Sequence, residues 1–271
     1  MEIRGVDFTS RPRRHKTITV ARGTLQAGAF HLCGIEHLPS FEAFEFFLRE
    51  PGPWVAGFDF PFGLPREFCA ELGWLGEGAS WETIAQKLAA ISREQLTAHC
   101  RAYCNARPPG AKFAHRATDR LAGSSPSMKW VNPPVVYMLQ EGAPRLLASG
   151  VHIPGQHDGD ASRIALEAYP GFLVRTITRA SYKNDQRAKQ TPALAAARQQ
   201  IIAALVSGNY SLAIPLVTSR GVLDEMQDDA SADTLDAVLC ALQAAWAWQR
   251  CQQNFGLPLG MDALEGWIAT V

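Results

Sequence analysis

The chain has 271 residues, of which 26 are lysine or arginine and 26 are aspartate or glutamate, so its formal net charge is zero. Hydrophobic residues make up 47% and charged residues 19%, a balance that excludes an intrinsically disordered chain. Zero net charge also argues against non-specific wrapping of duplex nucleic acid, because that binding depends on many basic residues. A chain of this length can form one large core, and we predict a single domain over residues 1–271.

The sequence has no feature of a membrane or secreted protein. No stretch approaches the roughly 18 consecutive apolar residues that a membrane helix needs. Residues 1–16 have no apolar segment ahead of their basic cluster, so they do not form a secretory signal. The six cysteines include no CxxC pair, and we interpret them as reduced, buried thiols. We therefore expect a soluble, cytoplasmic protein with no membrane partner.

The first part of the chain predicts an antiparallel meander followed by a helix and a fourth strand. Three β-rich segments at residues 3–9, 17–21 and 29–35 are separated by short polar connections. Residues 40–49 predict a helix, because phenylalanines repeat at helical spacing behind a serine cap. Residues 54–60 are apolar and end at a proline, which predicts the fourth strand.

Residues 66–160 have a different pattern and predict a mostly helical insertion. An amphipathic helix is expected over residues 81–91, and apolar residues from 96 onward continue it or begin a second helix. A loop rich in Gly, Pro and Ser follows at 107–134, and another helix is expected over 134–148.

An α/β pattern resumes after the insertion. Residues 164–169 predict a fifth strand, and residues 192–206 a helix that ends at a glycine. Residues 211–217 predict a short strand or an extended connection, and a last long helix is expected over about 231–252. Three antiparallel strands that lead into parallel ones, with helices on the faces, predict a mixed five-stranded α/β sheet.

Acidic residues occupy unusual positions in these elements. Asp7 lies in the apolar first strand, Asp59 at the end of the fourth, and Glu167 in the fifth. Asp233 and Asp236 begin the last helix at a spacing that places them on one face. A buried carboxylate is costly unless it is hydrogen-bonded, protonated or bound to a cation, and hard oxygen ligands suit Mg²⁺ or Mn²⁺. Two such ions can orient an attacking water and stabilise the leaving oxygen of a phosphodiester.

Each acid also has a structural interpretation. Asp59 precedes a proline and could fix a turn through backbone hydrogen bonds. Asp233 lies in a first helical turn, where the helix dipole favours any acid. Glu167 could pair with one of the arginines. Taken together in this strand order, the five acids favour a metal site over these separate interpretations.

Five short motifs lie along these segments, from residue 5 to residue 268. They are Gly-Val-Asp at 5–7, Phe-Asp-Phe-Pro-Phe-Gly-Leu-Pro at 58–65, Glu-Ala-Tyr-Pro at 167–170, Asp-Thr-Leu-Asp-Ala-Val-Leu-Cys-Ala at 233–241 and Glu-Gly-Trp-Ile at 265–268. In this order they resemble a known family, catalogued as domain of unknown function 429 and described as predicted nucleases of ribonuclease H-like fold. The resemblance implies a ribonuclease H-like fold and a nuclease activity.

The start of the last helix also resembles that of bacterial Holliday junction resolvases, where two aspartates complete a metal site with acids from the first and fourth strands. This resemblance implies that Asp7 bridges two Mg²⁺ or Mn²⁺ ions, with Asp59 on one side and Asp236, helped by Asp233, on the other. Glu167 falls on a family motif and joins Asp7, Asp59 and Asp236 as an implied catalytic residue.

Basic clusters in predicted loops are candidates for phosphate contacts, although exposed charges are often only solvated surface. They include Arg13 and Arg14 after the first strand, Arg116 in the insertion, and Lys183 and Arg187 after the fifth strand. The sequence has no GxxxxGK[ST], GxGxxG or GxSxG motif.

We predict a metal-dependent nuclease that hydrolyses phosphodiester bonds of DNA, RNA or a nucleotide-like substrate. Two alternatives stay open: a nucleotide-binding phosphotransferase or ATPase-like protein of the same fold, and a non-catalytic scaffold that keeps the acids for folding.

Overall fold

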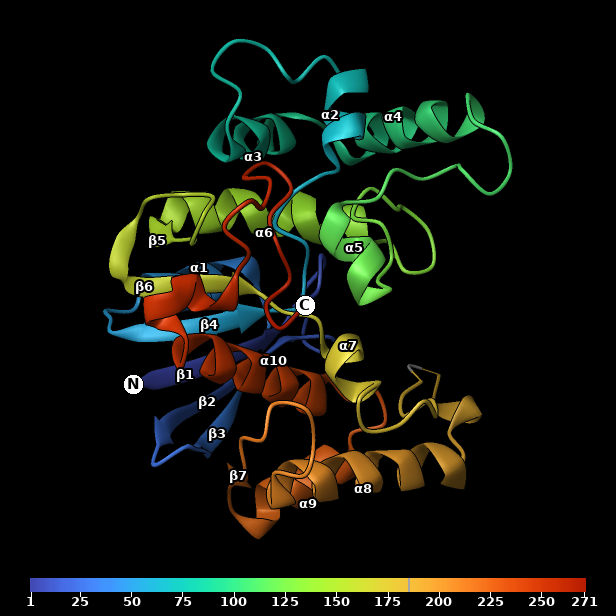
Figure 1. The fold of residues 1–271 in the computed structure, drawn as a ribbon. Coiled ribbons are helices and arrows are strands. Elements are labelled where there is room, and N and C mark those ends of the chain that lie inside the picture. The colour runs from blue at the N-terminus through green and yellow to red at the C-terminus, as the bar shows by residue number, and fades with distance from the viewer. Residues whose placement is uncertain (185) are drawn as a thin grey trace.

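The computed structural model describes residues 1–184 and 186–271, which form a mixed sheet with helices on both faces (Figure 1). The described strands are ordered β5-β6-β4-β1-β2-β3-β7. β2 is antiparallel to β1 and to β3, whereas the other neighbouring pairs are parallel. The strands are β1 Glu2–Asp7, β2 Ile18–Gln26, β3 Ala29–Leu38, β4 Trp54–Phe58, β5 Val151–His152, β6 Asp160–Glu167 and β7 Leu216–Val217.

The prediction of a mixed α/β sheet flanked by helices is confirmed, but the count of five strands is wrong. The sheet has seven strands over the described residues, because β5 and β7 extend its two edges. Each of these edge strands is two residues long. β7 lies within residues 211–217, the segment expected to be a short strand or an extended connection. β5 is too short to show an alternation of polar and apolar side chains, so the pattern that identifies a strand cannot detect it.

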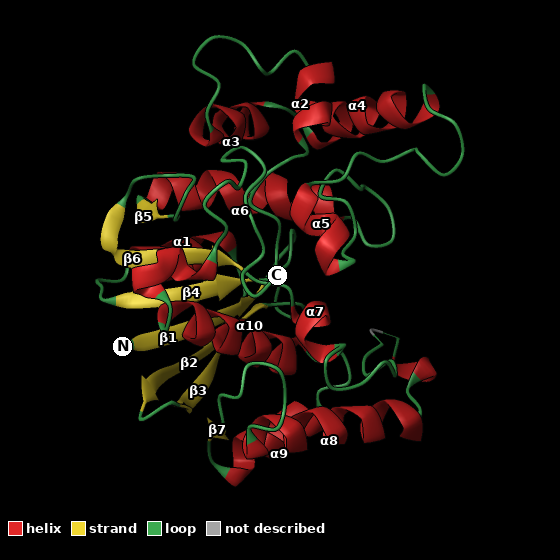
Figure 2. Cartoon of the chain, viewed as in Figure 1, coloured by secondary structure: helices red, strands yellow, loops and turns green. Residues whose placement is uncertain are grey.

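Different helices cover the two faces of the sheet (Figure 2). Helices α1, α2, α3, α4 and α6 share one buried apolar cluster with the sheet, and α7, α8, α9 and α10 share the other. The helices are α1 Phe41–Arg49, α2 Arg66–Glu71, α3 Trp81–Ala90, α4 Arg93–Asn105, α5 Ala117–Ala122, α6 Val135–Ser149, α7 Pro170–Val174, α8 Pro192–Ser207, α9 Arg220–Asp228 and α10 Asp233–Trp248, with 3₁₀ turns η1 Arg187–Lys189 and η2 Cys251–Gly256.

Between β4 and β6 the chain forms helices α2 to α6 and then β5. The stretch 107–134, expected to be a loop, contains the six-residue helix α5. This helix is too short to show an apolar repeat in the sequence. Among the helices of the described residues, none has both the length and the apolar character required to cross a membrane.

Helix α10 lies directly on the backbone of β1 and β4. A β-carbon on Gly5 would be 2.0 Å from the carbonyl oxygen of Ala237, and one on Gly57 would be 2.4 Å from that of Cys240. Gly5 and Gly57 are register partners on adjacent parallel strands. Any side chain at these two positions would push α10 away from the sheet, so the glycines set how closely the helix approaches it.

Candidate metal centre

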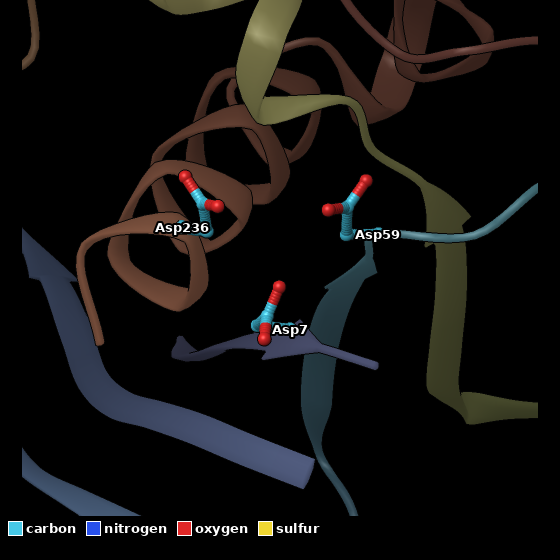
Figure 3. Close-up of side chains that lie close together, drawn as sticks. All are labelled: Asp7, Asp59 and Asp236. Carbon is cyan, nitrogen blue, oxygen red and sulfur yellow. The ribbon is translucent and has the colours of Figure 1, made fainter. Parts of the chain in front are cut away.

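Three aspartates come together where β1 and β4 end (Figure 3). Asp7 is the last residue of β1, and Asp59 follows the last residue of β4. The backbone N–H of Asp59 donates to the carbonyl of Val6 at 2.9 Å, which continues the parallel ladder. Asp236 lies in the first turn of α10. One carboxylate oxygen from each of Asp7, Asp59 and Asp236 lies within 4.8 Å of the other two.

The alternation of the strands explains why these side chains face α10. On β1, Ile3 belongs to the buried cluster beneath α10, and Gly5 contacts that helix. On β4, Val55 belongs to the same cluster and Gly57 contacts α10. Successive residues of a strand point to opposite faces, so the residue two positions after Gly5 or Gly57 lies on the α10 side. Asp7 and Asp59 occupy those positions.

The loop before α10 fixes where the helix begins. The carboxylate of Asp229 accepts hydrogen bonds from the backbone N–H of Ser231 at 3.1 Å and of Thr234 at 2.9 Å. Ala232, the residue before the helix, has φ of 61°, in the left-handed region. The Asp229 carboxylate therefore satisfies a backbone donor of the first turn. This start places Asp236 over the ends of β1 and β4.

The three carboxylates differ in their partners. Asp236 is fully buried; its Oδ1 accepts a hydrogen bond from the hydroxyl of Tyr182 at 2.7 Å, and its Oδ2 accepts one from the ammonium of Lys183. Asp7 is 8% exposed and Asp59 is partly exposed. Within the described residues, no donor contacts the carboxylate of either Asp7 or Asp59. The carboxylates of Asp7 and Asp59, which point at Asp236, thus lack the hydrogen bonds that buried carboxylates require.

The surroundings raise the pKa of all three acids. Burial is the largest cause of the raised pKa of Asp7, and the charges of Asp233 and Asp236 add to it. Burial also raises the pKa of Asp59 to about 7, although the charge of Lys183 opposes the shift. The pKa of Asp236 is raised by burial against the opposing effects of Lys183 and Tyr182. Three carboxylates this close favour a proton or a cation among them.

A family model described as a protein of unknown function (DUF429) matches residues 5–256 of the chain. The chain belongs to the DUF429 family. The matched segment contains the end of β1 and all of β4 and α10, and therefore all three clustered aspartates. No curated protein and no solved structure matched this DUF429 chain.

Asp233, predicted as a fourth ligand, has its carboxylate bound elsewhere in this DUF429 structure. Both of its oxygens accept hydrogen bonds from the ammonium of Lys16, at 2.8 and 2.9 Å. Lys16 lies in the turn between β1 and β2, so this ion pair fastens that turn to the start of α10. Asp233 is close enough to raise the pKa of Asp7 but is not one of the three clustered acids.

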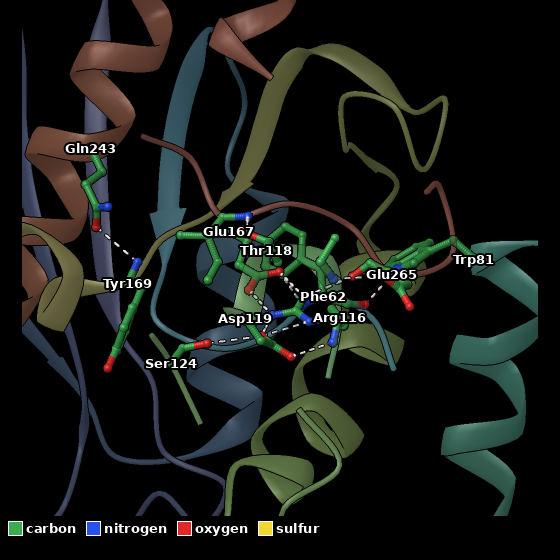
Figure 4. A network of polar contacts seen from close by, with 12 residues as sticks. Phe62, Trp81, Arg116, Thr118, Asp119, Ser124, Glu167, Tyr169, Gln243 and Glu265 are labelled. Atoms are coloured by element: carbon green, nitrogen blue, oxygen red, sulfur yellow. Dashed lines mark hydrogen bonds and ion pairs between the residues drawn. The ribbon is translucent and has the colours of Figure 1, made fainter. Parts of the chain in front are cut away.

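Glu167, predicted as catalytic, lies outside the cluster of three. Arg116 donates to both of its carboxylate oxygens, at 2.6 and 2.7 Å, and the backbone N–H of Phe62 donates to one of them at 2.9 Å (Figure 4). The alternative interpretation, that Glu167 pairs with an arginine, is therefore confirmed. The interpretation of Arg116 as part of a substrate-facing cluster is wrong, because this residue is 1% exposed and its side chain also binds Asp119.

The ion pair of Glu167 with Arg116 helps to fix the backbone of the segment that follows Asp59. Phe62 is held at both backbone polar groups, because Glu167 accepts from its N–H and the indole of Trp81 donates to its carbonyl at 2.7 Å. Sequence patterns did not identify Arg116 or Trp81 in this role. Residues 51 positions apart form the pair, and no local periodicity signals such a contact.

The other predicted substrate-binding residues differ in their surroundings. Arg13 and Arg14 are exposed in the turn between β1 and β2, close in sequence to Asp7, and their contact with phosphates stays a prediction. Lys183, 44% exposed, binds Asp236 instead of standing free on the surface. Burial lowers the pKa of Lys183, but the negative charges around it, that of Asp236 first and those of Asp7 and Asp59 with it, together outweigh this effect and keep that pKa well above its ordinary value. The side chain of Arg187 lies outside the described part of the structure.

Proposed function

We propose that this DUF429 protein is a divalent-metal-dependent nuclease that hydrolyses phosphodiester bonds, with Asp7, Asp59 and Asp236 as its metal site. The observation that carries the proposal is the pair of carboxylates on Asp7 and Asp59, which receive no hydrogen bond from the described residues and point at Asp236. An all-carboxylate set of oxygen ligands fits Mg²⁺ or Mn²⁺ better than a softer metal.

The order of the strands supports a ribonuclease H-like fold for this chain. The central strands run β3-β2-β1-β4-β6, with only β2 antiparallel to its neighbours among these five. Asp7 and Asp59 end the two middle parallel strands, and α10 brings Asp236 against them. Ligands of open α/β sheets bind beyond the carboxyl ends of the strands, which is where these acids lie.

The proposed chemistry divides between the cation and the residues of the chain. A bound Mg²⁺ or Mn²⁺ would orient and acidify the attacking water and stabilise the leaving oxygen. Asp7 and Asp59 would supply ligand oxygens, and Tyr182 and Lys183 hold the carboxylate of Asp236 in one orientation. The exposed Arg13 and Arg14 would contact phosphates of DNA, RNA or a nucleotide.

A cleavage panel tests the proposal. Single-stranded and duplex DNA, RNA, branched junctions and dinucleotides are incubated with the protein in Mn²⁺ and in EDTA. We expect cleavage of at least one substrate in Mn²⁺, its loss in EDTA, and a loss of at least about a hundredfold in Asp59→Asn. The matched control is Asp158→Asn, which removes an exposed carboxylate and should leave cleavage unchanged. Absence of cleavage by folded, Mn²⁺-loaded protein would favour a phosphotransferase-like protein or a scaffold.

A further inference from the structure

We infer that the candidate metal centre holds one divalent cation instead of the two expected by resemblance, and that the ammonium of Lys183 occupies the place of the second. This inference rests on the proposed function, because it assigns the number of ions and their partner in that same site. It is carried by the unequal partners of the three aspartates and by the way Lys183 is anchored.

The two sides of the cluster differ in the ligand atoms that they offer. Both oxygens of Asp236 already accept a hydrogen bond, one from the Tyr182 hydroxyl at 2.7 Å and one from the Lys183 ammonium. Asp7, 8% exposed, and Asp59 accept none within the described residues. A cation would therefore bind between Asp7 and Asp59. Each oxygen of Asp236 has at most one lone pair left to offer this cation.

Lys183 is held at Asp236 by its neighbours in the chain. The carbonyl of Tyr182 accepts a hydrogen bond from Arg198 at 2.9 Å, and Arg198 is 5% exposed on α8. On the other side of Lys183, the N–H of Asn184 donates to the carbonyl of Ala230 at 3.2 Å, in the loop that leads into α10. The backbone on both sides of Lys183 is thus fixed relative to Asp236.

The charges of the cluster agree with one divalent ion. The nearby Asp233 and Glu167 each have a basic partner, Lys16 and Arg116 respectively. Among the described residues, the three clustered carboxylates and the ammonium of Lys183 together carry two negative charges, which a single Mg²⁺ or Mn²⁺ neutralises. A second divalent ion beside Asp236 would have to displace Lys183 or lie next to its positive charge, and like charges at such a distance repel each other.

The stoichiometry of Mn²⁺ binding tests this inference. Free Mn²⁺ is followed by electron paramagnetic resonance while the ion is titrated into the purified full-length protein. We expect saturation at one Mn²⁺ per chain. In Lys183→Met we expect a second Mn²⁺ to bind, with a Kd at least about tenfold lower than that of any second ion on the unchanged protein. Lys183→Arg, which keeps the charge, should bind one ion.

Control variants separate the outcomes. Lys189→Met removes an exposed lysine from the same segment and should bind one ion. If Lys183→Met fails to fold, as judged by circular dichroism, Lys183→Gln repeats the test with a neutral donor. Two ions on the unchanged protein, or one on a folded neutral variant at position 183, would overturn the role of Lys183 and leave the proposed function standing. No Mn²⁺ on any folded variant would overturn the proposed function together with this inference.

Discussion

Gly5 and Gly57 lie side by side on β1 and β4, and the backbone of α10 fills the space where their side chains would be. Because the helix contacts the strands directly, its first turn reaches the ends of both. Asp7 and Asp59 lie two residues beyond the glycines, on the same face. The position of the acidic cluster therefore depends on two residues that carry no side chain.

Substituting either glycine should disturb both the fold and the cluster. For Gly5→Val we expect a loss of at least about 2 kcal/mol in the free energy of unfolding, because the added atoms meet helix backbone instead of a flexible side chain. Urea denaturation measures the loss. Gly34→Ala is the matched control, since a β-carbon at this position on β3 meets nothing within 4 Å. Equal stability of the two variants would contradict the packing described for α10.

Binding of Mn²⁺ should strengthen as the pH rises through neutrality. The pKa of Asp59 is raised from its ordinary 3.8 to about 7, and a metal requires the ionised carboxylate. Below pH 7 the ion must displace a proton, so each unit of decrease in pH should weaken binding about tenfold or more. Calorimetric titrations at pH 6, 7 and 8 measure the change. An affinity that is constant over this range would show that no acid with a raised pKa binds the ion.

The same shift should make the metal-free protein less stable at higher pH. An acid whose pKa is higher in the folded than in the unfolded protein stabilises the fold at low pH, and this contribution is lost between about pH 4 and pH 7. Asp59→Asn carries no such charge. In EDTA, the melting temperature of Asp59→Asn minus that of the unchanged protein should therefore be larger at pH 8 than at pH 5. A difference that is the same at both pH values, or as large in Asp158→Asn, would contradict this account.

The buried pair of Arg116 and Glu167 should contribute strongly to folding. Arg116→Met leaves the carboxylates of Glu167 and Asp119 buried without their cation, for which we expect a loss of about 3–5 kcal/mol. The double variant Arg116→Met with Glu167→Gln should lose less, because one stranded charge is removed. Arg101→Met, at an exposed position of α4, is the control. Chemical denaturation compares these three variants with the unchanged protein. Equal stability of Arg116→Met and Arg101→Met would contradict this account.

Local sequence patterns could predict Asp7, Asp59 and Asp236 because the responsible features are local. Strand alternation fixes the face of Asp7 and Asp59, and the approximate start of the last helix fixes that of Asp236. Asp233 satisfied the same pattern, but its partner is Lys16, which is 217 residues away. No spacing along the chain reveals a contact of that kind.

The other contacts that the sequence did not reveal have a similar physical cause. The position of Lys183 at Asp236 and of Arg116 at Glu167 depends on contacts across 53 and 51 residues. The local sequence around an arginine or lysine in a predicted loop does not reveal whether its side chain is exposed or buried against an acid. The structure distinguishes the two cases because it shows which carboxylate each guanidinium or ammonium reaches.

The central claim is that Asp7, Asp59 and Asp236 bind a divalent cation, and titration of Mn²⁺ into the unchanged protein and into Asp7→Asn at pH 8 tests it most directly. Asp7 is the most buried of the acids that accept no hydrogen bond within the described residues. We predict saturable binding to the unchanged protein and its loss in Asp7→Asn, with the same circular dichroism spectrum for both. Binding that is unchanged in Asp7→Asn, or absent from the unchanged protein, would contradict the claim.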